Sequence, residues 1–181
     1  MEIHLHDKIG GQWTYELDRL IEVVNQYKPR SYLEVGAREG IALRYFVERV
    51  PSIETVSAVD LPGAKWGRKD SKAELLDNFA ALGMPWVFHE GNSTSPSIVE
   101  DVSKTRYDVI FIDADHTYEG VKQDWENYGP LADMLVCFHD INHPSNSPAY
   151  GPSKLWNELK TDTSIELIKH GSRKGIGVLR K

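Results

Sequence analysis

The side chains most able to do chemistry follow two apolar runs of the chain. Asp113, Asp115 and His116 come directly after one run, and His139 and Asp140 close the second. Runs of this length that are rich in Val, Ile and Phe are typical of buried strands. The carboxyl ends of such strands face the crevice in which open α/β sheets bind ligands. We therefore expect the chemistry of this protein at these acidic and imidazole groups.

Asp113, His139 and Asp140 can converge on one point, because the tips of neighbouring strands lie about 5 Å apart. Two carboxylates and an imidazole suit a divalent ion. Mg²⁺ prefers oxygen ligands alone, so His139 shifts the preference toward Mn²⁺, Fe²⁺ or Zn²⁺. Without a metal, we expect the crowded carboxylates to raise each other's pKa, and His116 or His139 to act as a general base near neutral pH. The residues alone leave both alternatives open.

A glycine-containing turn joins the first expected strand to its helix. The turn contains Glu34, Gly36, Ala37 and Gly40. Glycines here would let a ligand approach the backbone amides at the start of the helix. The spacing differs from the Gly-x-Gly-x-x-Gly of dinucleotide sites and from a phosphate-binding loop. A negative Glu34 would also disfavour phosphate and favour a cationic ligand or an ammonium group.

Two further strand ends carry groups suited to a nucleoside. Asp60 comes about 20 residues after the glycine turn, where a carboxylate can accept hydrogen bonds from both hydroxyls of a ribose. Asn92 and Ser93 follow the third strand and could bind the edge of adenine, or they could serve only to cap the next helix. Together with the glycine turn, these groups favour adenosine binding.

The apolar spacing predicts helices and strands that alternate along the chain. The first helix is expected over 13–27, with Thr14 as its N-cap, and a second reaches to about residue 50. Further helices are expected over 72–82, 97–103, 117–131 and 154–160, and strands over 31–35, 55–60, 86–89, 108–113, 134–138, 165–170 and 175–179. This order predicts an α/β fold, a Rossmann-like three-layer sandwich with a mostly parallel seven-stranded sheet. The short turn 171–175 predicts an antiparallel last strand.

Length and composition set further limits. The 181 residues suit one domain, with a leading segment and helix over 1–30 and an α/β core over 31–181. A net charge of -6 and a pI near 5.6 argue against a nucleic-acid partner. No apolar stretch approaches the roughly 20 residues of a membrane span, and the single Cys137 predicts a buried thiol in a cytoplasmic protein. The basic residues Lys65, Arg68 and Lys69 are expected in a solvated loop.

These motifs together resemble the class I S-adenosylmethionine-dependent methyltransferases, from about Trp13 to the end of the chain. The family's Glu-x-Gly-x-x-x-Gly turn matches Glu34, Gly36 and Gly40, and its acidic ribose ligand matches Asp60. Within this class, the run Phe-Ile-Asp-Ala-Asp-His-x-Tyr and the later His-Asp pair resemble the Methyltransf_24 group. They are similar, more distantly, to catechol and caffeoyl-CoA O-methyltransferases.

The resemblance implies S-adenosylmethionine as methyl donor and a hydroxyl of a small molecule or glycan as acceptor. It places Asp113, His139 and Asp140 on positions that bind a divalent ion, Mg²⁺ or Mn²⁺, and His116 on the position of a lysine that serves as base. His139 departs from the family's carboxylate, so two accounts stay open. Either a cation activates the acceptor and His116 takes the proton, or His139 or His116 acts without a metal while Asp140 orients the imidazole. The expected cofactor-binding residues are Glu34, Gly36, Ala37, Gly40, Asp60, Leu61, Asn92, Ser93, Asp113 and Ala114.

Two other functions are consistent with the same residues. A metal-dependent hydrolase could use Asp113, His139 and Asp140 to activate water, although the glycine turn would then have no purpose. A non-catalytic nucleotide-binding module of the same fold would keep the crevice without turnover. Exposed aromatic residues such as Trp13 or Trp156 could also support a homodimer.

Overall fold

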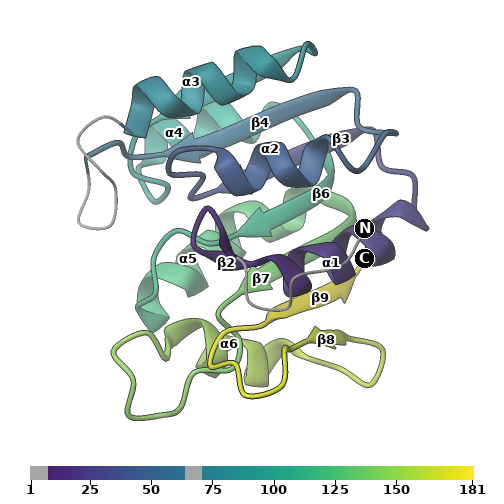
Figure 1. The fold of residues 1–181 in the computed structure, drawn as a ribbon. Coiled ribbons are helices and arrows are strands. Elements are labelled where there is room, and N and C mark those ends of the chain that lie inside the picture. The colour runs from purple at the N-terminus through teal and green to yellow at the C-terminus, as the bar shows by residue number, and fades with distance from the viewer. Residues whose placement is uncertain (1–7, 64–70) are drawn as a thin grey trace.

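The computed structural model describes residues 8–63 and 71–181, and a seven-stranded sheet forms its centre (Figure 1). The strand order is β5-β4-β3-β6-β7-β9-β8, with β9 antiparallel to both neighbours and the other pairs parallel. This confirms the predicted α/β fold with an antiparallel last strand. The predicted basic loop of Lys65, Arg68 and Lys69 lies outside the described residues. The strands are β3 (Ser31–Val35), β4 (Thr55–Asp60), β5 (Trp86–Glu90), β6 (Tyr107–Ile112), β7 (Ala132–His139), β8 (Ile165–Leu167) and β9 (Ile176–Arg180).

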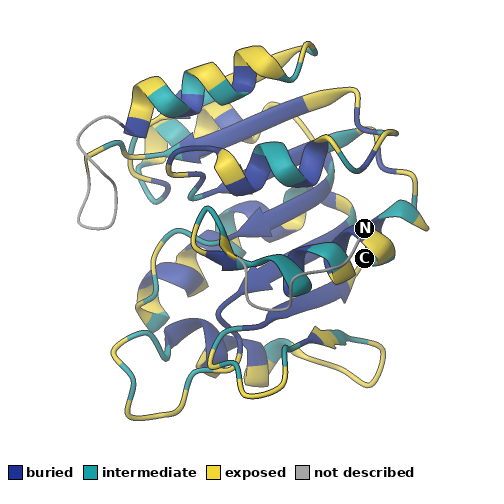
Figure 2. Cartoon of the chain, in the orientation of Figure 1, coloured by how far each residue is buried: buried dark blue, intermediate teal, exposed yellow. Residues whose placement is uncertain are grey.

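Helices cover both faces of the sheet, and side chains of the central strands alternate between the two faces. Tyr32 and Phe111 pack into one hydrophobic cluster, whereas Leu33 and Ile110 pack into the other. Because both faces are covered, the central strands are rich in apolar residues and mostly buried (Figure 2). One face carries α1 (Thr14–Asn25), α2 (Ile41–Val47) and α3 (Ser71–Ala81), and the other carries α4 (Pro96–Val102), α5 (Tyr118–Tyr128) and α6 (Gly151–Leu159).

The predicted helices are present, and the differences at their ends have local causes. The expectation for Thr14 is wrong, because Trp13 is the N-cap of α1 and Thr14 is the first helical residue. Thr117 is the N-cap of α5, since its hydroxyl oxygen accepts a hydrogen bond from the Gly120 amide at 3.0 Å. Helix α5 ends before Pro130, which has no amide hydrogen to continue the pattern, and a short 3₁₀ turn (Gly129–Leu131) follows.

The C-terminal elements differ in length from the prediction. Helix α6 begins at Gly151 rather than at residue 154, because Pro152 lies in its first turn, where the fixed φ of proline suits a helix. Strand β8 ends at Leu167, and the chain then runs through a loop, residues 168–175, to β9.

A small hairpin precedes α1 and was not predicted. Strands β1 (Lys8–Ile9) and β2 (Gln12–Trp13) pair antiparallel across a turn that contains Gly10. A Cβ added at Gly10 would lie 2.9 Å from the Ala42 amide nitrogen, so the hairpin packs against the start of α2. Strands of two residues are too short to show a period of two, which explains why the sequence did not reveal them.

Segments from the beginning, middle and end of the chain meet at the carboxyl edge of the sheet. Strands β3, β4, β6 and β7 are parallel and end there. Because β9 is antiparallel to β7, with Ile176 opposite His139, the loop 168–175 lies at the same edge. The N-terminal hairpin also reaches this edge, where Gln12 Nε2 donates a hydrogen bond to Asp113 Oδ2 at 2.9 Å.

Two expectations about burial have opposite outcomes. Cys137 is fully buried in β7, as predicted. The expectation that Trp156 is exposed is wrong, because only 1% of its surface is accessible. Its ring lies over Gly177, where an added Cβ would come within 2.6 Å of the ring, and its Nε1 donates to Glu166 at 2.6 Å. Trp13 is partly exposed and lies beneath two lysine ammonium groups, 4.5 and 3.9 Å from its ring centre.

Within residues 8–63 and 71–181, none of the helices combines the length and apolar character that crossing a membrane requires.

Candidate active site

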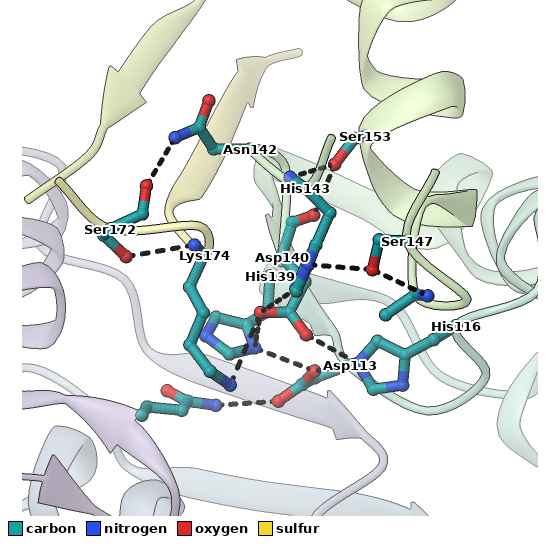
Figure 3. A network of polar contacts seen from close by, with 12 residues as sticks. Asp113, His116, His139, Asp140, Asn142, His143, Ser147, Ser153, Ser172 and Lys174 are labelled. Atoms are coloured by element: carbon teal, nitrogen blue, oxygen red, sulfur yellow. Dashed lines mark hydrogen bonds and ion pairs between the residues drawn. The ribbon is translucent and has the colours of Figure 1, made fainter. Parts of the chain in front are cut away.

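Four titratable side chains come together where β6 and β7 end (Figure 3). We call Asp113, His116, His139 and Asp140 the Asp-His cluster. Asp113 follows β6, His139 ends β7, Asp140 follows it, and His116 lies in the turn before α5. One ligand atom from each residue lies within 4.8 Å of the others. The structure therefore brings together the groups that the sequence analysis assigned to catalysis and metal binding.

Each imidazole of the cluster faces both carboxylates. His139 Nδ1 lies 3.0 Å from Asp113 Oδ1 and 3.4 Å from Asp140 Oδ1. His116 Nε2 lies 2.9 Å from Asp140 Oδ2 and 3.5 Å from Asp113 Oδ1. Asp115 is not part of this arrangement, because its carboxylate accepts a hydrogen bond from the amide two residues on, at 2.7 Å, and shapes the turn before α5.

Burial and mutual attraction act in opposite directions on the pKa values of the cluster. Burial raises the pKa of Asp113 and of Asp140, but the two imidazoles lower both pKa values by more, so the net shift is downward. The charge of Asp113 does raise the pKa of Asp140, as expected from crowding, but this effect does not set the net direction. Hydrogen bonds to Asp113 and Asp140 raise the pKa of His116 to about 10, against the effect of burial. Burial lowers the pKa of His139, but the charge and hydrogen bond of Asp113 together with the charge of Asp140 outweigh burial, so the net shift is upward.

These pKa values decide which protonation state the cluster adopts. With both carboxylates charged, His116 keeps its proton at neutral pH, because its pKa is about 10. A protonated imidazole cannot accept a proton from an acceptor. His116 can act as a general base near neutral pH only when another positive charge takes over its role beside the carboxylates.

The backbone at Asp140 directs its carboxylate into the cluster. Asp140 has a φ of 59°, in the left-handed region, which Asp tolerates better than most side chains. Ser153 Oγ, at the start of α6, donates to the Asp140 carbonyl at 2.8 Å and accepts from the His143 amide at 2.7 Å. Helix α6 thereby holds the turn after β7 in place.

Three polar side chains that were not in the predicted set surround the cluster. Gln12 donates to Asp113, and His143 Nε2 and Lys174 Nζ each lie 3.5 Å from Asp140 Oδ1. The sequence carried a usable signal for Lys174, because an antiparallel last strand places the loop before it beside Asp140. His143 follows Asp140 closely in the chain, so its proximity also follows from the sequence. Gln12 had no such signal.

The donor atoms of the cluster fit a divalent cation. Both imidazoles face Asp113 Oδ1, and each faces one oxygen of Asp140, so nitrogen and oxygen donors gather around one point. Asp140 Oδ1 is buried and has no hydrogen-bond partner among the described residues, since its contacts with cationic groups are 3.4 to 3.5 Å long. Imidazole ligands favour Mn²⁺, Fe²⁺ or Zn²⁺ over Mg²⁺. Such an ion would replace the protons of the imidazoles that ligate it.

A second group of predicted residues lies where β3 and β4 end. Asp60 Oδ2 accepts a hydrogen bond from the Arg38 amide at 2.8 Å, and burial raises the pKa of Asp60. Leu61, directly after it, leaves 48% of its surface exposed. Ala37 is buried, and Gly40 is the N-cap of α2 with a φ of 71°. An exposed apolar side chain beside a carboxylate and the start of a helix suits a nucleoside, which combines an apolar ring face with hydroxyl groups.

Gly36 connects the two groups of residues. Its φ is 96°, and an added Cβ would lie 2.4 Å from the Asp113 carbonyl oxygen and 2.6 Å from Ala114 Cα. The amide of Asp113 donates to the Val35 carbonyl at 2.8 Å, so the two chain segments are held together. Backbone packing therefore requires glycine here, in addition to the ligand contact expected from the sequence.

Glu34 is buried beneath these groups. Only 3% of its surface is exposed, and its Oε2 accepts a hydrogen bond from the Tyr32 hydroxyl at 2.7 Å. Burial raises the pKa of Glu34 to about 8, with further increases from the charges of Asp113 and Asp60 and a decrease from Tyr32. A bound ammonium group nearby would lower that pKa again. The expected role of Glu34 toward a cationic ligand stays a prediction.

Asn92 and Ser93 follow β5. The Asn92 side-chain oxygen accepts hydrogen bonds from the amide and hydroxyl of Thr94, both at 3.0 Å. The N-cap of α4 is Ser95, so neither Asn92 nor Ser93 caps that helix. Ser93 lies beside the buried Asp124, and burial raises the pKa of Asp124 to about 6. The proposed contact of Asn92 and Ser93 with adenine stays a prediction.

A family model also matches this chain. The model of Methyltransf_24, described as a methyltransferase domain, matches residues 33–141. The matched residues begin in β3 and end just after Asp140, so they include the whole Asp-His cluster. A search among curated proteins found no significant match.

Several solved structures share the fold. An O-methyltransferase from Bacillus cereus in complex with S-adenosylhomocysteine has a TM-score of 0.70 at 15% identity, covering 99% of this chain and 84% of that chain. A protein of Staphylococcus aureus, provisionally assigned as a caffeoyl-CoA O-methyltransferase, has a TM-score of 0.66 at 19% identity, with coverages of 91% and 82%. The O-methyltransferase TomG from Streptomyces achromogenes, involved in tomaymycin synthesis and solved with S-adenosylmethionine, has a TM-score of 0.63 at 12% identity, with coverages of 90% and 77%. At these identities the likeness shows the fold alone.

Proposed function

The chain belongs to the Methyltransf_24 family of methyltransferase domains, and we propose that it transfers the methyl group of S-adenosylmethionine to a hydroxyl oxygen. One observation carries this proposal. Asp113, His116, His139 and Asp140 converge at the same sheet edge as Asp60. Structures of the same fold from Bacillus cereus and Streptomyces achromogenes contain S-adenosylhomocysteine or S-adenosylmethionine, which supports the choice of donor. Membership of the family argues against the metal-dependent hydrolase.

The residues between β3 and β5 would hold the donor. Asp60 would accept hydrogen bonds from the ribose hydroxyls, as its place at the end of β4 suggests. Leu61 offers the exposed apolar surface that a purine ring would cover, and Asn92 and Ser93 offer hydrogen-bonding groups for its edge. The turn from Gly36 through Ala37 to Gly40 and the tip of β6 at Asp113 and Ala114 would complete the site. When bound, the donor supplies a sulfonium methyl group for in-line transfer, and positioning of the acceptor provides much of the acceleration.

We propose that the Asp-His cluster activates the acceptor with the help of a divalent ion. Asp113, His139 and Asp140 would hold Mn²⁺ or Mg²⁺, which as a Lewis acid lowers the pKa of the acceptor hydroxyl. If a bound cation shared the charge of the two carboxylates, the pKa of His116 would fall from its value of about 10. The neutral imidazole of His116 can then take the proton of the acceptor.

The pKa values of the cluster favour this account over the metal-free alternative. Without a cation, His116 or His139 would have to lose its proton while both carboxylates remain charged. Asp113 and Asp140 hold that proton by raising the pKa of both imidazoles. Metal-free catalysis by His116 would therefore be restricted to alkaline pH.

We further propose a glycan or another small molecule rich in hydroxyl groups as acceptor. Gln12, His143 and Lys174 surround the cluster with groups that donate or accept hydrogen bonds. Such groups suit an acceptor with several hydroxyls, which must be oriented so that one of them reaches His116.

Transfer of a labelled methyl group from S-adenosylmethionine to a panel of acceptors tests this function. The panel contains sugars, oligosaccharides, catechols and amines, each assayed with Mn²⁺, with Mg²⁺ and with EDTA. We expect transfer to a sugar hydroxyl, stimulated by Mn²⁺ and lowered by orders of magnitude in His116→Ala. His170→Ala is the matched control, because His170 is exposed and outside the cluster. Transfer to amines alone would contradict O-methylation, and no transfer to any acceptor would favour the non-catalytic module.

A further inference from the structure

Beyond methyl transfer itself, we infer that the ammonium group of Lys174 is an internal cation of the Asp-His cluster, which a bound divalent ion displaces from Asp140. The inference rests on the proposed use of the cluster as a cation site. Its consequence is that Lys174 sets how tightly the protein binds the metal. The lysine and the metal would compete for the same carboxylate.

The contacts of Asp140 are the first observation. Lys174 Nζ lies 3.5 Å from Asp140 Oδ1, and its side chain points toward that carboxylate from the loop before β9 (Figure 3). The same oxygen faces His139 Nδ1 at 3.4 Å and His143 Nε2 at 3.5 Å. Charge-assisted hydrogen bonds are shorter, about 2.7–2.9 Å, so none of these groups saturates the oxygen. A metal ion at about 2 Å would bind it directly and more strongly.

The backbone around Lys174 is fixed, whereas its side chain can move. The Lys174 amide donates to Ser172 Oγ at 3.0 Å, and Asn142 Nδ2 donates to the Ser172 carbonyl at 2.7 Å. These bonds tie the loop to the segment that follows Asp140. The Lys174 side chain is 29% exposed, and a lysine stem has four rotatable bonds. The ammonium group can therefore leave Asp140 for solvent without any change in the fold.

Charge balance gives the reason for displacement. The carboxylates of Asp113 and Asp140 carry two negative charges. Lys174 brings a positive charge to within 3.5 Å of one of these carboxylates. A divalent ion between the carboxylates balances both charges by itself, so an ammonium group left in place would be repelled. Removing the charge of Lys174 should therefore strengthen metal binding.

Mn²⁺ binding to the full chain tests the inference. Lys174→Met removes the charge and keeps an unbranched stem, whereas Lys174→Arg keeps the charge. We expect Lys174→Met to bind Mn²⁺ about tenfold more tightly than wild type at neutral pH, measured from the electron paramagnetic resonance signal of free Mn²⁺. Lys174→Arg should stay near wild type. Lys104→Met is the matched control, since Lys104 forms an exposed ion pair with Asp101 at 3.0 Å, and it should leave the affinity unchanged.

A second readout follows the lysine itself. Acetylation of Lys174 by a soluble acetylating reagent, quantified by peptide mass spectrometry, should become several-fold faster when Mn²⁺ saturates the protein. Lys104 serves as the internal reference in the same sample. Unchanged acetylation of Lys174, or Mn²⁺ affinity that is equal or weaker in Lys174→Met, would overturn the inference. Absence of Mn²⁺ binding in every variant would overturn it as well.

Titration of S-adenosylhomocysteine into the same samples separates this inference from the proposed function. If the nucleoside binds normally while Lys174→Met leaves the Mn²⁺ affinity unchanged, only the inferred role of Lys174 is refuted. If the nucleoside does not bind, the methyl-transfer proposal is lost, and the Mn²⁺ comparison still decides the role of Lys174.

Discussion

Gly36→Ala should destabilise the protein far more than the same substitution at Gly83. Both glycines have a positive φ, 96° at Gly36 and 65° at Gly83, so alanine at either position carries a backbone strain of roughly 1–2 kcal/mol. At Gly36 the new Cβ would also lie 2.4 Å from the Asp113 carbonyl oxygen and 2.6 Å from Ala114 Cα. At Gly83 nothing lies within 4 Å of an added Cβ. Comparing the two variants therefore isolates the free-energy cost of the close contact at Gly36.

The expected magnitudes follow from these contacts. Forcing a methyl group into packed surroundings adds about 1–3 kcal/mol at Gly36. Alanine also restricts the unfolded chain, which raises the free energy of unfolding by about 0.4–1 kcal/mol at both positions. This contribution cancels when the two variants are compared. We expect the free energy of unfolding to fall by about 1 kcal/mol in Gly83→Ala and by about 2–4 kcal/mol in Gly36→Ala.

Urea denaturation followed by far-ultraviolet circular dichroism measures both values, and equal slopes against urea would show that the unfolded states are comparable. The Asp113 backbone must shift to make room for the new methyl group. The folded Gly36→Ala variant should therefore also bind Mn²⁺ more weakly than wild type when no urea is present. Equal losses of stability in the two variants would refute the reasoning. They would mean that the end of β3 and the start of the cluster do not pack as described.

Three further predictions concern buried groups and the cluster. Burial raises the pKa of Asp124 to about 6, whereas an Asp in the unfolded chain has a pKa near 3.9. The free energy of unfolding should therefore fall by up to about 3 kcal/mol as pH rises from about 4 to 6. In urea unfolding, Asp124→Asn should therefore be more stable than wild type above pH 6 and should lose this advantage near pH 4. An equal advantage at both pH values would argue against the raised pKa of Asp124. Burial also raises the pKa of Cys137, so a thiol reagent such as dithionitrobenzoate should react only with the unfolded protein, and rapid reaction of the native protein would contradict the burial of β7. His116→Ala and Asp140→Asn should each leave the affinity for S-adenosylhomocysteine nearly unchanged, because neither residue belongs to the donor site, while turnover falls by orders of magnitude; full turnover in either variant would remove that residue from the mechanism.

The sheet could be predicted from sequence because its strands are buried on both faces. The boundaries of β3 and β4 match the prediction, since each is an apolar run that ends in a glycine turn or an aspartate. The position of the Asp-His cluster followed from the same signal, because polar groups directly after two buried strands must meet at one edge. That residues 1–181 form a single domain stays a prediction.

The surroundings of the cluster could not be predicted in the same way. Gln12 reaches Asp113 from a hairpin whose strands have two residues each, too few to show a pattern. Trp156 is buried because it packs over Gly177, a pairing between α6 and β9 that no local pattern reveals. The direction of the carboxyl pKa shifts was also missed, since it depends on imidazole nitrogens only 2.9 to 3.0 Å away.

The proposed function depends above all on the edge formed by β3, β4, β6 and β7 binding a sulfonium nucleoside. Titration calorimetry of S-adenosylhomocysteine into wild type and Asp60→Ala tests it most directly. Asp133→Ala is the matched control, because Asp133 lies near the start of β7, away from the carboxyl edge, and pairs with Arg106 on the surface. We predict micromolar binding to wild type and to Asp133→Ala, and its loss in Asp60→Ala. Absence of binding to wild type, or unchanged binding to Asp60→Ala, would contradict the account.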